Sequence, residues 1–260
     1  MRSSDFTRFG KERHLTAHED ETGRDFPEMA AMWQNRKVSV TSVHQFAEKV
    51  SLVTDITDPI GRAAALQLAL QGSYVIGGVP KGSPDDGGLA EELRSLGTLA
   101  LTAEYIPSTA DGAKELVDVV KGAFGRLDLL VNCLKIGADS AFFEPGETSG
   151  TDDGISDPVA DAAIGLMGER PKPRMVFVFQ WAATEASGSK HESQLAATFV
   201  MKLVERSPKN FRVNAVETVS GTESRLATAP DDVARVILFL LSSEATAVNG
   251  QSIMLTGGRT

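Results

Sequence analysis

Residues 50–76 read VSLVTDITDPIGRAAALQLALQGSYVI, and this stretch decides the fold. Its first four residues form a short apolar run, which predicts a strand. After a turn, the Ala- and Leu-rich segment from Ile60 to Gln71 predicts a helix, and Tyr74–Ile76 predicts a second strand. Two apolar strands joined by one helix are typical of a parallel sheet, because parallel neighbours need a crossover connection.

The same alternation of strands and helices continues to the C-terminus. It predicts an α/β fold, a Rossmann-like doubly wound parallel sheet, in a single domain over residues 44–260. Residues 82–88 and 144–158 are rich in Gly, Pro and Asp and are expected to be loops. Further strands are expected at 99–105, 127–132, 175–179, 212–216 and 252–255, and further helices at 89–96, 113–124, 194–205 and 231–241.

The first 43 residues differ from the rest of the chain. They are polar, carry seven basic and seven acidic residues, and show weak hydrophobic periodicity. This segment is expected to be a flexible extension that folds partly onto the domain, or alternatively an arm that binds a partner. Its acidic residues argue against a mitochondrial presequence, because such segments are poor in acidic residues.

Composition narrows the class of protein. The chain has 260 residues, 42% of them hydrophobic, and a net charge of −9, which argues against partners such as nucleic acid and anionic membranes. The single Cys133 fits a reducing compartment, and the four His residues lack the spacing of metal ligands. No apolar run reaches the roughly 18 residues of a membrane span. We therefore expect a cytoplasmic globular protein without a metal site.

Several segments match one known family in the right order along the chain. They are FAEKVSLVT (46–54), LDLLVN (127–132), FRVNAV (211–216), PDDVARVILFLLSSEA (230–245) and NGQSIMLTGG (249–258). These segments resemble the short-chain dehydrogenase/reductase family, in its 3-oxoacyl-reductase-like branch. The resemblance covers residues 44–260. It implies the Rossmann-like fold, a nicotinamide cofactor (NAD or NADP) and oxidoreduction at a carbonyl carbon.

The cofactor turn departs from the family pattern. Family members have Thr-Gly-x-x-x-Gly-x-Gly, whereas residues 54–61 of this chain read TDITDPIG. Asp55 and Asp58 place carboxylates where a pyrophosphate should lie, and Pro59 has no N–H to donate. Asp58 and Pro59 suit instead the N-cap and the first residue of a helix. The candidate cofactor-binding residues that still match the family are Thr54, Gly61 and Asn132.

The catalytic pair of the family is missing. Family members use a Tyr as general acid/base, a Lys four residues later and a Ser that orients the substrate carbonyl. This chain has two tyrosines, Tyr74 and Tyr105, and none after residue 105, so no Tyr-x-x-x-Lys is present in that region. The position of the orienting Ser holds Gln180 or Trp181, and a Trp could fill the nicotinamide pocket.

Weak catalytic candidates lie where the Tyr–Lys pair would be. They are Ser189, Lys190 and His191. His191 could act as a general acid/base, since an unperturbed imidazole has a pKa near 6.5. Lys190 is adjacent in sequence rather than one helical turn away, so the two side chains would point apart. A solvated polar turn before a helix explains these residues more simply, and we assign no catalytic residue.

Three hypotheses for function follow. The first is a member of the family without dehydrogenase activity: a scaffold, sensor or partner subunit, in a homo-oligomer or in a hetero-oligomer with another subunit of the family. It predicts no cofactor. The second is an NAD(P)-dependent oxidoreductase that reduces a carbonyl or 3-oxoacyl substrate in a rearranged site. The third is a protein that binds another small ligand in the vacated cleft.

Overall fold

The computed structural model of the chain describes residues 44–83, 88–107, 109–136, 157–182, 190–219 and 228–257, without the side chains of Lys190 and His191. The extension predicted over residues 1–43 and most of the loop predicted over 144–158 lie outside the described residues. Whether residues 44–260 form one domain therefore stays a prediction.

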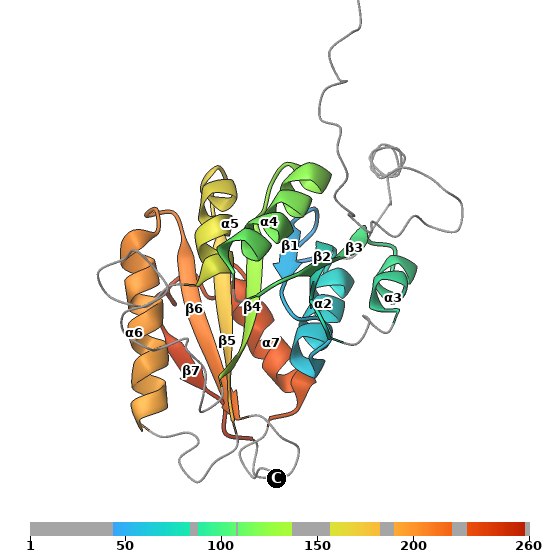
Figure 1. Ribbon diagram of the computed structural model, residues 1–260. Helices are drawn as coiled ribbons and strands as arrows, with labels where there is room; N and C mark the ends of the chain where they lie inside the picture. The colour runs from blue at the N-terminus through green and yellow to red at the C-terminus, as the bar shows by residue number, and fades with distance from the viewer. Residues whose placement is uncertain are drawn as a thin grey trace, which may run out of the picture. The chain divides into compact units, whose positions relative to one another are not determined.

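Within the described residues, seven parallel strands form one sheet in the order β3-β2-β1-β4-β5-β6-β7, with helices on both faces (Figure 1). The predicted Rossmann-like fold is confirmed. The strands are β1 (Val50–Val53), β2 (Tyr74–Pro80), β3 (Ala100–Tyr105), β4 (Leu129–Ile136), β5 (Arg174–Trp181), β6 (Arg212–Val219) and β7 (Ser252–Met254). The helices are α2 (Pro59–Leu70), α3 (Leu89–Ser95), α4 (Ala110–Phe124), α5 (Pro158–Gly168), α6 (Lys190–Arg206) and α7 (Pro230–Leu241).

One of these helices, α5, is absent from the elements predicted above. It follows the Asp157–Pro158 pair, and the Asp157 side chain accepts a hydrogen bond from the Ala160 amide as the N-cap. The predicted loop ended at residue 158, directly where the helix begins. The sequence prediction places the Asp-Pro pair in that loop, because Asp and Pro are common in loops. The same pair is also typical of the start of a helix.

The central strands bury both of their faces. On β5, Phe177 and Phe179 pack into the core cluster that includes residues of α4, α5 and α6. Val176 and Val178 pack into the second cluster, which includes residues of α2, α3 and α7. Because successive residues of a strand point to opposite faces, this division fixes the face to which each later residue of β5 projects.

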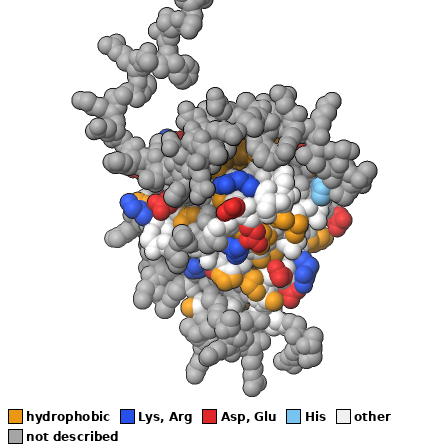
Figure 2. Space-filling model, turned by 90° about the vertical axis from the view of Figure 1, so that its right-hand side faces the viewer, with side chains coloured by type: hydrophobic (Ala, Val, Ile, Leu, Met, Phe, Trp, Pro, Cys, Tyr) orange, Lys and Arg blue, Asp and Glu red, His pale blue; other side chains and the backbone are white. Residues whose placement is uncertain are grey.

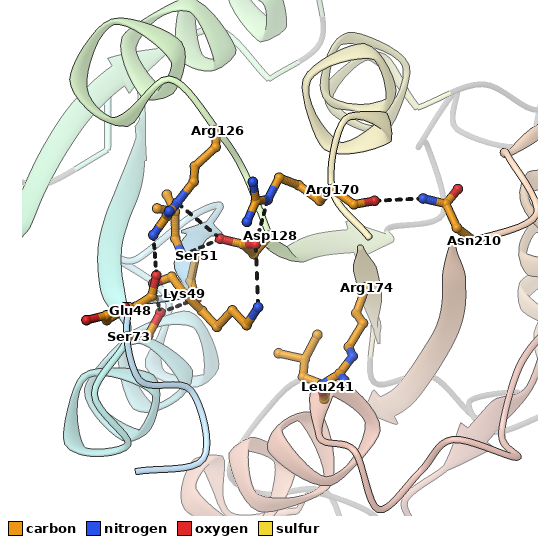
Figure 3. A network of polar contacts seen from close by, with 11 residues as sticks. Glu48, Lys49, Ser51, Ser73, Arg126, Asp128, Arg170, Arg174, Asn210 and Leu241 are labelled. Carbon is orange, nitrogen blue, oxygen red and sulfur yellow. Dashed lines mark hydrogen bonds and ion pairs between the residues drawn. The ribbon is translucent and has the colours of Figure 1, made fainter. Parts of the chain in front are cut away.

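A buried carboxylate joins several elements at the amino edge of the sheet (Figure 3). Asp128 accepts hydrogen bonds from the Val50 amide at 3.0 Å and from Arg170 Nε at 2.9 Å. Its oxygens also lie 3.7 Å from Lys49 Nζ and 3.6 Å from Arg126 Nε. Three cations and one amide thus compensate a side chain that is only 4% exposed. This network fixes the start of β4 against β1 and the segment after α5.

Charged and apolar side chains are interspersed on the face shown in Figure 2. This face is the side of the molecule that carries α3 and β3 (Figure 1). Arg62 of α2 and Glu92 of α3 form an ion pair. Among the described residues of this face, side chains of opposite sign therefore lie beside one another rather than in a patch of one sign.

Candidate functional site

The candidate site lies at the carboxyl edge of the sheet, around the ends of β1, β4, β5 and β6. In doubly wound sheets, ligands bind outside this edge at the point where the strand order reverses. Here the order reverses between β1 and β4. The helices α2 and α5, which follow these two strands along the chain, begin at the same edge (Figure 1).

Two aspartates shape the turn from β1 into α2. Asp55 has a left-handed backbone with φ of 50°, a conformation that Gly adopts most easily and Asp tolerates. Asp58 is the N-cap of α2, because its Oδ1 accepts a hydrogen bond from the Ile60 amide at 2.9 Å, and Pro59 follows as the first helical residue. The N-cap predicted from the sequence is confirmed. The chain itself thereby satisfies an amide that could otherwise bind a phosphate.

Lys135 closes this turn from the neighbouring strand β4. Its Nζ lies 2.8 Å from Asp55 Oδ2 and 3.5 Å from Asp58 Oδ2. Gln180 Nε2 donates to Asp58 Oδ1 at 3.2 Å, and Thr57 Oγ1 donates to Asp55 Oδ1 at 2.6 Å. Burial alone would lower the pKa of Lys135. The hydrogen bond and charge of Asp55, together with Asp58, outweigh burial and raise that pKa.

Sequence reasoning missed Lys135. The only available signal is that Lys135 follows the strand predicted over 127–132 by three residues. Its partner Asp55 is 80 residues away in sequence, and one sequence alone does not show which strand ends meet.

The predicted cofactor residues Thr54 and Asn132 come together, whereas Gly61 has a packing role. Thr54 Oγ1 donates to Asn132 Oδ1 at 2.8 Å and accepts from the Cys133 amide at 2.8 Å. A side chain at Gly61 would collide with the carbonyl oxygen of Asp55. The polar groups of Thr54 and Asn132 therefore bond within the protein, and Gly61 lets α2 pack against its own turn.

Asp157, the N-cap of α5, extends the Thr54–Asn132 pair. Its Oδ1 accepts from Asn132 Nδ2 at 2.8 Å and from the Ala160 amide at 2.7 Å. Asp157 is 2% exposed. Burial raises the pKa of this carboxyl to about 6, although both hydrogen bonds act to lower it. The site therefore contains a buried carboxyl group whose pKa is raised well above that of an ordinary Asp.

Apolar and aromatic side chains fill the ends of β2 and β3. A Cβ added at Gly77 would lie 2.5 Å from Ile56 Cδ1, and one added at Gly78 would lie 3.0 Å from Tyr105 Cε1. Tyr105 is 4% exposed. Burial raises the pKa of its phenol, which forms a hydrogen bond with Thr54. Both glycines therefore serve close packing of the chain against itself.

At the end of β5, Trp181 is fixed by a buried glutamate. Trp181 Nε1 donates to Glu217 Oε2 at 3.1 Å, and Ser252 Oγ donates to Glu217 Oε1 at 2.6 Å. The indole also stacks on Phe179, with ring centroids 5.8 Å apart. Trp181 is 2% exposed. A buried indole thus lies at a strand end where the family resemblance implies an orienting Ser.

The weak catalytic candidates fall at the margin of the described chain. Ser189 lies outside the described residues, and Lys190 and His191 form the start of α6 without described side chains. Their proposed chemistry therefore stays a prediction. Within the described residues, no group of three or more His, Cys, Asp or Glu side chains is placed to hold a metal ion. No described helix has both the length and the apolar character that crossing a membrane requires.

No protein-family model matches the chain, but individual proteins do. An L-rhamnose 1-dehydrogenase from Azotobacter vinelandii is 27% identical over 246 residues, which cover 81% of this chain and 96% of that protein. A 3-oxoacyl-acyl-carrier-protein reductase from Thermotoga maritima is 28% identical, covering 81% and 97%. A short-chain type dehydrogenase/reductase from Mycobacterium marinum aligns with a TM-score of 0.63 at 18% identity, covering 83% and 96%. The chain is therefore similar in sequence and fold to members of the short-chain dehydrogenase/reductase family.

These similarities confirm the resemblance to the short-chain dehydrogenase/reductase family that the strand and tail segments predict. The three relatives are named as a dehydrogenase, a reductase and a dehydrogenase/reductase, and the first name includes NAD(P)+. The structural similarity shows that the chain has the fold of these proteins.

Proposed function

We propose that this family member does not carry out the family's hydride transfer and acts through its fold, as a scaffold, a sensor or a partner subunit. The observation that carries the proposal is the ion pair of Lys135 with Asp55 and Asp58. It occupies the β1–α2 turn, where the family resemblance implies the pyrophosphate of a dinucleotide.

The described residues do not fit that pyrophosphate. Two carboxylates would lie within a few ångströms of it, and each close pair of like charges costs roughly 1–4 kcal/mol at effective dielectrics between water and a protein surface. Pro59 has no N–H, and the Ile60 amide already donates to Asp58. The positive charge of Lys135 is already engaged by the two aspartates. These contacts support the proposal that a dinucleotide does not bind in the family's manner.

The two tyrosines also support it. Tyr74 begins β2, at the opposite edge of the sheet, and stacks on Phe124 with ring centroids 5.7 Å apart. Tyr105 is near the candidate site, but burial raises the pKa of its phenol. A Tyr that acts as general acid/base needs the opposite shift, toward neutral pH.

A hydride-transfer assay tests this proposal. The purified full chain is incubated with NADH or NADPH and ethyl acetoacetate, a small 3-oxo ester, and absorbance of the reduced nicotinamide is followed. We expect no rate above the protein-free blank. A rate that saturates with cofactor would contradict the proposal.

An NAD(P)-dependent oxidoreductase with a rearranged site is the second candidate, and the relatives' names favour it. Thr54, Gly61 and Asn132 remain as the residues that match the family's cofactor site, and Ser189, Lys190 and His191 as sources of a new acid/base. If the assay shows a rate, the variant His191→Ala separates the possibilities. A loss of rate in this variant assigns the acid to His191, whereas an unchanged rate places it elsewhere.

Assembly is part of the first proposal, because a scaffold or partner subunit acts through contacts with other chains. The expected partner is a second copy of this chain or another subunit of the family. Light scattering on the purified full chain gives its mass in solution. A monomer that also fails to co-purify with a co-expressed family reductase would contradict the role of partner subunit.

A further inference from the structure

The site at the β1–α2 turn contains a row of polar side chains on three neighbouring strands. Lys135 of β4 is in register with Gln180 of β5, which is in register with Thr218 of β6. Each lies two residues beyond a member of the core cluster shared with α2 and α7, namely Cys133, Val178 and Val216. Because the side-chain period of a strand is two, the row projects to the face that carries α2.

Two carboxylates face this row and already hold an ammonium group. Asp55 and Asp58 come from the α2 side, with side chains only 10% and 8% exposed. The Nζ of Lys135 lies between them, whereas the Lys135 side chain as a whole is 56% exposed. The carboxylates are therefore held within the protein, whereas much of the Lys135 side chain that carries the ammonium group is exposed. Asp55 and Asp58 thus form a binding site for an ammonium group, and the side chain of Lys135 occupies that site.

Thr218 provides an independent observation. It is 1% exposed, and its Oγ1 is buried without a hydrogen-bond partner. A buried hydroxyl without a partner costs about 1–3 kcal/mol, so such groups are rare unless a ligand or water completes them. Its neighbour in the row, Gln180, bonds directly to Asp58. The Thr218 hydroxyl thus projects to the same face as Gln180, one strand away from the side chain that bonds to Asp58.

We infer that the β1–α2 turn of this protein is a binding site for a small primary amine in its protonated form, and that Lys135 fills this site in the free chain. Asp55 and Asp58 would hold the ammonium group, and Thr218 would bond to a polar atom of the same ligand. The inference rests on the proposed function, because a site that binds ammonium groups rejects the phosphates of a dinucleotide. It gives the proposed role of sensor a class of ligand, a small primary amine.

Chemical rescue tests the inference with a defined probe. The variant Lys135→Ala removes a three-carbon ammonium unit, which n-propylammonium chloride supplies from solution. We expect a lower melting temperature for Lys135→Ala than for wild type, and a saturable increase on addition of n-propylammonium. Ligands that bind only the folded state raise the melting temperature in this way. Lys135→Gln keeps a hydrogen-bonding side chain at the position and should destabilise the protein less. The same test is therefore repeated in this variant.

Matched controls assign the effect to the two carboxylates. Lys114→Ala removes a lysine whose side chain is 70% exposed and pairs with Asp118 within α4, and n-propylammonium should shift it no more than wild type. Neutral n-propanol and tetramethylammonium chloride, which lacks N–H donors, should not rescue Lys135→Ala. The double variant Lys135→Ala/Asp55→Asn should lose the rescue.

The outcomes separate this inference from the proposed function. An equal shift by n-propylammonium in wild type, Lys114→Ala and Lys135→Ala, or no shift in any of them, would overturn the amine site. Hydride transfer by the wild-type chain would overturn the proposed function, whatever the rescue shows. Rescue of Lys135→Ala without hydride transfer supports both.

Discussion

At the scale of single residues, Asp157 links the candidate site to pH. Burial raises its pKa from the ordinary 3.8 to about 6. Between these values the unfolded chain has released the proton that the folded chain keeps. The stability that Asp157 contributes is therefore fully present below about pH 4 and is lost as the pH rises to about 6. At about 1.4 kcal/mol per pKa unit, the loss totals about 3 kcal/mol.

The variant Asp157→Asn isolates this effect. The Asn oxygen can still accept from Asn132 and the Ala160 amide, but it does not titrate. Urea unfolding from pH 4 to pH 7 should show wild type losing stability relative to the variant across this window. A constant difference between the two proteins would show that Asp157 titrates normally. Asp118→Asn, at a side chain that is 53% exposed, is the control.

Most substitutions of core residues lower the free energy of unfolding, but a substitution at Thr218 is expected to raise it. Val has nearly the shape of Thr without the hydroxyl, and the Thr218 Oγ1 has no partner. Thr218→Val should therefore raise the free energy of unfolding by about 1 kcal/mol, because a buried unpaired hydroxyl is removed. Denaturant unfolding measures this change. A lower stability would mean that the hydroxyl has a partner in solution.

Replacing Asp128 should lower the free energy of unfolding strongly. Its carboxylate is compensated by three cations and the Val50 amide (Figure 3). Asp128→Ala leaves that amide and the Arg170 guanidinium without their acceptor, so we expect a loss of about 2–4 kcal/mol in the free energy of unfolding. The exposed pair Arg235–Asp232 gives the comparison, since Asp232→Ala should cost less than about 1 kcal/mol. Equal losses in urea unfolding would argue against this ranking.

At the scale of elements, the entry into α2 depends on close packing at Gly61. A Cβ there would collide with the Asp55 carbonyl, whereas a Cβ at Gly165 of α5 meets nothing within 4 Å. Gly61→Ala should destabilise the protein by about 1–3 kcal/mol. Gly165→Ala should stabilise it by up to about 1 kcal/mol, because Ala is the better helix former. Thermal unfolding of the two variants, measured in parallel with wild type, checks that the melting temperature falls for Gly61→Ala and rises for Gly165→Ala.

The elements also show what could be predicted from the sequence. Strand and helix periodicities, together with Asp58 and Pro59 at a helix start, predicted most elements and the parallel sheet. The helix α5 was missed because its Asp157–Pro158 start was read as the end of a loop. The ion pair of Lys135 with Asp55 joins positions 80 residues apart. Such a contact depends on which strands become neighbours, which local patterns do not specify.

At the scale of the whole molecule, the fold and the site point to different conclusions about activity. Relatives that match this chain over nearly their full length are named as dehydrogenases and reductases. The described core has the fold of a solved short-chain type dehydrogenase/reductase. The ends of its strands at the candidate site, however, are filled by Ile56, Tyr105 and the ion pair of Lys135 with the two aspartates. The sequence alone shows that the catalytic Tyr is missing. Only the structure shows which side chains fill the site.

Direct titration of the full-length chain with NADH and NADPH, followed by isothermal calorimetry up to millimolar concentration, tests the central claim. The carboxylates of Asp55 and Asp58, the missing N–H of Pro59 and the engaged Lys135 predict no saturable heat for either dinucleotide. Saturable binding with a micromolar dissociation constant would contradict the account, because the turn would then open to accept a pyrophosphate.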